Sequence, residues 1–133
     1  MPIGPFFLTY PDIALLLLRI ALGVIFLVHG WTKIRNLAKT RQAFTSMMVP
    51  VPLISSIYAA FVEFFGGLFL FTGLYTGWVL LALVIDMFGA MLFVDFKKGF
   101  SGGWEFNLAL VAMASALLLM GPGSFTVMQY LGK

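Results

Sequence analysis

Three ionisable side chains stand inside long apolar stretches, where a charge is costly unless it meets a partner or faces a cavity. They are Arg19 in LLLLRIALG, Glu63 in AAFVEFFGG and Asp86 in LALVIDMFG. At ~1.5 Å of helical rise per residue, counted from one side of a membrane, they lie at depths of about 10, 16 and 12 Å. We therefore predict an Arg19–Glu63 contact with Asp86 nearby, which would form an intramembrane polar cluster.

Two roles stay open for this cluster. The Arg19–Glu63 contact is either a structural ion pair that fixes helix register or part of a ligand or proton site. Because one guanidinium faces two carboxyl groups, one carboxyl should hold a proton unless a lysine or a partner subunit reaches it. Asp86 shares a helical stripe with Gly89, Ala90 and Phe93, and an acid without a cation is harder to explain by packing than an ion pair is.

A second polar group lies toward the opposite ends of these stretches. It contains His29, Trp31, Lys33, Asp95, Trp104, Glu105 and Asn107. We interpret His29 as an interfacial hydrogen-bonding residue rather than a ligand. Glu105 stands where the last apolar stretch begins, so we interpret it as a residue that caps a helix N-terminus and complements the helix dipole.

The composition requires that a membrane surrounds most of this chain. Of its 133 residues, 62% are hydrophobic and 10% are charged, whereas soluble domains carry about 25% charged residues. Four apolar segments are predicted as helices, at about 13–31, 53–74, 78–95 and 104–120, and the loop between the second and the third is very short. The fold class is therefore all-α, an integral membrane four-helix antiparallel bundle in one domain over residues 1–133.

The distribution of lysine and arginine predicts the orientation. Six basic residues follow the first and third segments, and Lys133 stands alone at the opposite side. The six are Lys33, Arg35, Lys39, Arg41, Lys97 and Lys98. Because basic loops stay in the cytoplasm, both termini should lie outside a cell membrane, the inner one where there are two. An amphipathic piece at 36–48 should lie along the membrane surface, and no cleavable signal peptide is evident before the first segment.

Several kinds of chemistry are excluded by what the sequence lacks. It has no cysteine and one histidine, so disulfides, iron–sulfur ligation and bis-histidine haem ligation within one chain are excluded. No residues have metal-ligand spacing or the pattern of a phosphate-binding loop, and the basic residues do not indicate nucleic-acid binding. If the chain takes part in redox chemistry, its cofactor is held elsewhere or is a lipid-soluble quinone.

Four segments, in their order and spacing, resemble the DoxX family of small four-helix membrane proteins. They are RIALGVIFLVHGWTKI, EFFGGLFLFTGLYT, GFSGGWEFNLAL and GPGSF. The resemblance picks out Arg19, Gly23, His29, Gly30, Lys33, Glu63, Gly66, Gly67, Gly73, Gly103 and Glu105. Asp86 lies outside the family pattern, so its role would be particular to this chain.

The resemblance also implies a redox association, because the family includes the small subunit of a thiosulfate–quinone oxidoreductase. We therefore expect an accessory or structural subunit of a membrane-bound, quinone-linked complex, or a homo-oligomer, surrounded by lipid. The alternative is a stand-alone binder or carrier of a small lipophilic molecule such as a quinone. A third hypothesis is an enzyme that uses Glu63 or Asp86 as an acid–base group on a lipid-soluble substrate.

Overall fold

The computed structural model describes residues 10–132 and forms four helices that are long and apolar enough to cross a membrane. These are α2 (Pro11–Arg35), α4 (Pro52–Thr72), α5 (Thr76–Ala90) and α6 (Glu105–Met120). Residues 10–132 contain no β-strand. The predicted all-α, multi-pass membrane fold is confirmed, and the observed helix boundaries lie within a few residues of the predicted ones. Residues 1–9 and Lys133, on which part of the orientation argument rests, lie outside the described residues.

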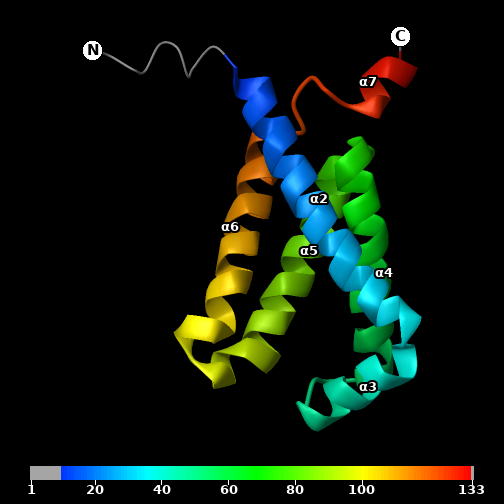
Figure 1. Ribbon diagram of the computed structural model, residues 1–133, viewed down its shortest axis with the longest axis vertical. Helices are drawn as coiled ribbons and strands as arrows, with labels where there is room; N and C mark the ends of the chain where they lie inside the picture. The colour runs from blue at the N-terminus through cyan, green and yellow to red at the C-terminus, as the bar shows by residue number, and fades with distance from the viewer. Residues whose placement is uncertain (1–9, 133) are drawn as a thin grey trace.

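The helices alternate in direction, and the two ends of the bundle differ (Figure 1). The start of α2 and the short helix α7 (Val127–Leu131) lie at one end, and α3 (Leu37–Ser46) lies at the other. Helices α4 and α5 leave a common short turn beside α7 and diverge toward the α3 end. The predicted amphipathic piece is α3, and none of its residues is buried.

Helices α2 and α4 touch through their backbones. A Cβ atom added to Gly23 would lie 3.0 Å from the carbonyl oxygen of Gly67, and one added to Gly67 would lie 2.7 Å from that of Gly23. A Cβ atom on Gly30 would overlap the backbone where Glu63 joins Phe64. Small residues permit this approach between membrane helices, and the contact fixes the register of α2 against α4.

Leucines form most of the core that all four helices share. Leu22 and Phe26 of α2 pack with Leu70 of α4, Leu83 of α5 and Leu117 of α6, and each is at most 1% exposed. The outward faces carry large exposed apolar residues instead. In water such a surface would aggregate, whereas in a bilayer it meets acyl chains.

The α5–α6 corner departs from regular α-helix. The π-helical turn η1 (Met91–Asp95) and the 3₁₀ turn η2 (Phe96–Lys98) extend α5, and η3 (Phe100–Trp104) leads into α6. Gly99 and Gly102 have φ angles of 82° and 74° here, which glycine adopts without the steric cost of a Cβ atom. With these turns the third and fourth spans run Thr76–Lys98 and Phe100–Met120.

Replacing Gly30 with alanine should destabilise the protein by about 1–3 kcal/mol, because the new methyl group forces two backbones apart. Thermal unfolding in detergent measures the change. Gly77→Ala is the control, since a Cβ atom there has no heavy atom within 4 Å. Equal midpoints for the two variants would show that α2 and α4 do not touch at Gly30.

Candidate functional site

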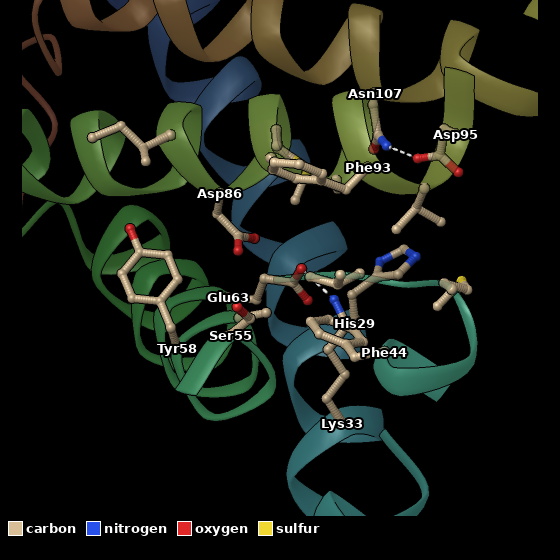
Figure 2. A pocket seen from close by; sticks show the side chains of 18 of the residues that line it. His29, Lys33, Phe44, Ser55, Tyr58, Glu63, Asp86, Phe93, Asp95 and Asn107 are labelled. Atoms are coloured by element: carbon tan, nitrogen blue, oxygen red, sulfur yellow. Dashed lines mark hydrogen bonds and ion pairs between the residues drawn. The ribbon is translucent and has the colours of Figure 1, made fainter. Parts of the chain in front are cut away.

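A cavity of about 600 Å³ lies where α4 and α5 diverge (Figure 2). Helix α2 forms its back, the α3–α4 linker and the turn η1 form two further walls, and the start of α6 contributes a few residues. Its polar lining residues are His29, Lys33, Ser55, Tyr58, Glu63, Asp86, Asp95 and Asn107. This volume falls within the range of about 300–1,000 Å³ that is usual for small-molecule sites.

Glu63 and Asp86 face each other across the cavity from α4 and α5 (Figure 2). Their carboxyl groups are close enough to interact electrostatically. Glu63 is 2% exposed, and one oxygen of each acid, Glu63 Oε2 and Asp86 Oδ2, is buried without a hydrogen-bond partner among residues 10–132. Buried polar atoms are nearly always hydrogen-bonded, so two such atoms in one cavity indicate a place for a ligand or water.

The cation that meets Glu63 is Lys33. Its Nζ atom forms an ion pair with Glu63 Oε1. Lys33 stands in the last turn of α2, and its side chain, 27% exposed, extends into the cavity (Figure 2). A lysine therefore reaches one of the two carboxyl groups, that of Glu63, which is the condition under which that carboxyl does not need to hold a proton. In the described part of the chain no basic side chain forms an ion pair with Asp86.

The predicted Arg19–Glu63 contact is wrong. Arg19 is 1% exposed and donates from Nε to the Leu70 carbonyl at 2.9 Å and from Nη1 to the Pro122 carbonyl at 2.8 Å. These oxygens lie near the C-terminal ends of α4 and α6, where the helix dipoles favour a positive charge. Counting depth from segment ends placed Arg19 level with Glu63, whereas the glycine contact sets Glu63 beside Gly30.

Four members of the second polar group, His29, Lys33, Asp95 and Asn107, line the same cavity as the acid pair. The His29 Nδ1 atom lies 2.8 Å from the Ile25 carbonyl oxygen, and because a carbonyl oxygen only accepts, Nδ1 carries a proton. His29 thus forms a hydrogen bond within its own helix while its ring lines the cavity, and its interfacial role stays a prediction.

Glu105 does not line the cavity, whereas Asp95 does. Glu105 Oε1 accepts a hydrogen bond from the Gly102 backbone N–H at 2.8 Å, which ties the turn η3 to the first residue of α6. Glu105 stands in the first turn of α6, where it complements the helix dipole, but no side chain caps the N-terminus of this helix, so the predicted capping bond is not observed. Asp95 accepts from the Asn107 amide and, at 3.1 Å, from Lys98 Nζ. Asp95 therefore has partners for both oxygens, unlike Asp86.

Aromatic rings supply much of the apolar wall, and most of them were not predicted as site residues from the sequence. The aromatic lining residues are Phe26, Phe44, Tyr58, Phe93 and Phe106. Phe93 belongs to the predicted Asp86 stripe, and Gly89 and Ala90 of that stripe also line the cavity. Tyr58 precedes Glu63 by five residues and donates its hydroxyl to the Ala82 carbonyl at 3.1 Å, which joins α4 to α5. Helical spacing from Glu63 could have identified Ser55 and Ala59 as its neighbours on one face.

The α3–α4 linker is the strained wall of the cavity. Met48 and Val51 have φ angles of 57° and 47°, and such left-handed conformations cost about 1–2 kcal/mol for residues other than glycine. Lys97 Nζ donates to the Met47 carbonyl at 3.2 Å and ties the linker to the α5 side. Strained segments of this kind persist where the surrounding contacts hold them.

A double-mutant cycle should detect coupling of at least about 1 kcal/mol between Lys33→Met and Glu63→Gln, because each single change leaves a buried charged group without its partner. Unfolding of the four proteins in detergent gives the coupling energy. The same cycle with Arg19→Met and Glu63→Gln should be additive, since Arg19 bonds only to carbonyl oxygens among the described residues. Coupling in the second cycle but not in the first would refute the observed pairing.

Comparison with known proteins finds a family match over the part of the chain that carries the acid pair. The DoxX family profile matches residues 14–95, which include the acid pair, Lys33 and His29. The protein named "Putative oxidoreductase CatD" from Bacillus subtilis (strain 168) is 34% identical over 110 residues, which cover 83% of this chain and 81% of that protein. The protein named "Inner membrane protein YqjF" from Escherichia coli (strain K12) is 29% identical over 130 residues, 92% of this chain and 95% of that protein. No solved structure matches the chain.

Proposed function

Because the chain belongs to the DoxX family, we propose that it is a subunit of a membrane-bound redox complex and that it binds a lipid-soluble quinone. The quinone ring would occupy the cavity around Glu63 and Asp86. The observation that carries the proposal is this cavity, with apolar and aromatic walls inside a membrane bundle and two acids at its polar centre.

The residues present suit a quinone ring. Flat aromatic faces such as Phe26, Phe44 and Phe93 can pack against the ring. Lys33 and the acid pair supply a few polar groups that can fix its oxygens, which is the usual composition of a small-molecule site.

The proposed subunit role rests on how few residues of this chain could bind a metal-containing redox cofactor. With no cysteine and one histidine, it lacks the ligand sets of iron–sulfur clusters and bis-histidine haem. Partner chains would therefore carry the electrons to or from the bound quinone. The name of the Bacillus subtilis relative supports a redox association for that protein, and the proposal extends it to this chain.

We place the α3 end of the bundle in the cytoplasm and both termini outside. Lys33, Arg35, Lys39, Arg41, Lys97 and Lys98 all belong to segments at or near the α3 end. Cytoplasmic loops carry such an excess of basic residues. The membrane would be the cell membrane, the inner one where there are two, in keeping with the name of the Escherichia coli relative.

A second candidate function is a stand-alone carrier of a lipophilic molecule. It is favoured by one specific observation, which is that side chains from α2, α4, α5 and α6 of this chain meet at the cavity. A carrier would bind its ligand without any partner, whereas a subunit would work within an assembly.

Gly89→Phe should abolish quinone binding, because Gly89 lines the cavity and a Cβ atom there has open space within 4 Å. The ring would extend into the space that the quinone is proposed to occupy. Equilibrium dialysis of purified protein against decylubiquinone measures the dissociation constant. Gly77→Phe is the matched control, on the same helix, outside the cavity and equally open. Unchanged binding in Gly89→Phe would place the quinone elsewhere and contradict the proposed site.

Gentle extraction of native membranes should recover the 14.7 kDa chain in an assembly several times larger, with the visible spectrum of haem or flavin. Mass determination of the extracted complex together with its absorption spectrum tests the subunit role. A colourless monomer or small homo-oligomer that still binds decylubiquinone would contradict that role and support the carrier.

A further inference from the structure

We infer that the cavity binds the reduced, hydroxyl-bearing quinol more tightly than the oxidised quinone. The inference rests on the proposed function, since it names the form of the ligand that the same site prefers. It depends on which hydrogen-bonding atoms of the cavity already have partners and which do not.

The unpartnered atoms are acceptors. Glu63 Oε2 and Asp86 Oδ2 are both buried carboxyl oxygens without a hydrogen-bond donor among the described residues. A proton shared between the two acids would still leave one Asp86 oxygen as an acceptor, whereas Glu63 Oε1 is already taken by Lys33. A ligand therefore completes the site when it brings O–H groups, and a ligand that offers only carbonyl oxygens leaves the carboxyl oxygens unsatisfied.

Most donors that line the cavity are already used. The Ser55 hydroxyl donates to the Pro50 carbonyl, and the Tyr58 hydroxyl donates to the Ala82 carbonyl. The Asn107 amide donates to Asp95. Lys33 Nζ and Asn107 Nδ2 keep further N–H bonds, because an ammonium group has three and an amide two, and the contacts with Glu63 and Asp95 use one of each. At Asp86, which forms no ion pair with a basic side chain of the described residues, the free oxygen favours a donor in the ligand.

A neutral hydroxyl fits this site better than a cationic donor. The Lys33 ammonium group already lies against Glu63, and a second positive charge beside it would be repelled. A quinol presents two O–H groups on a flat apolar ring, so it can satisfy the carboxyl oxygens while its faces contact Phe44 and Phe93.

Tighter binding of the reduced form has a redox consequence. A tenfold preference for quinol over quinone raises the two-electron midpoint potential of the bound couple by about 30 mV. The bound quinone would be easier to reduce than quinone free in the membrane. The site would thus favour an assembly that delivers electrons to quinone.

The test compares three ligands that share one tetramethylated ring. Duroquinol carries two O–H groups, duroquinone carries two carbonyl groups, and 1,4-dimethoxytetramethylbenzene carries neither an O–H group nor a carbonyl. Anaerobic equilibrium dialysis with the wild-type protein gives the three dissociation constants. Hydrogen bonds to charged groups predict that duroquinol binds at least about tenfold more tightly than the other two.

Variants locate the preference at the acid pair. Asp86→Leu removes one free acceptor and should reduce the preference for duroquinol to less than about threefold. Asp86→Asn is the second variant if the leucine protein does not fold, and it should also weaken the preference. Tyr58→Phe is the matched control and should leave the preference unchanged, because the lost hydroxyl bonds to Ala82 and not to a free acceptor.

The outcomes separate this inference from the proposed function. Equal binding of duroquinol and duroquinone, with both lost in Gly89→Phe, would overturn the preference and leave the quinone site in place. Failure of all three ligands to bind would overturn both. A preference that survives in Asp86→Leu and Asp86→Asn would also overturn the inference, because its source would lie away from the free acceptors.

Discussion

The backbone contact between α2 and α4 at Gly23, Gly30 and Gly67 determines where the charged groups of these two helices lie relative to each other. It sets Gly30 beside Glu63, so Lys33, one turn further along α2, meets that acid. The same register places Arg19 near the C-terminal end of α4, where it donates a hydrogen bond to the Leu70 carbonyl oxygen. A larger residue at any of these glycines would separate the helices and change both sets of partners.

This register divides the bundle into a closed end and an open end. At the closed end Arg19 bonds to Pro122. The Asp12 carboxylate accepts from the Ser124 backbone N–H at 3.0 Å and from its hydroxyl at 2.8 Å, so the chain after α6 is tied to α2. The α4–α5 turn also lies at this end, and the two helices diverge from it. Space therefore opens at the α3 end, around Glu63 and Asp86.

The sequence predicts which residues of two helices meet when a short loop joins the helices. It does not predict such contacts when the connection is long. Glu63 and Asp86 lie at similar distances along the chain from one tight turn, so their proximity follows from counting residues. Helices α2 and α4 are separated by α3 and a linker, and no count fixes their relative height. The Arg19–Glu63 prediction failed for that reason. Hydropathy predicted the four membrane-spanning helices correctly. No periodicity in the sequence indicates which aromatic rings face a cavity rather than lipid.

A molecule bound in the cavity would contribute to the protein's stability. The α5 stripe beside Asp86 carries Gly89 and Ala90, which are too small to fill the space against α4 with their own atoms. An acid without a cation and an unfilled apolar space both destabilise a fold, the first through desolvation and the second through lost van der Waals contacts. A molecule that fills the space and donates to the free oxygens removes both penalties at once. Because it binds only the folded bundle, its binding energy adds directly to the free energy of unfolding.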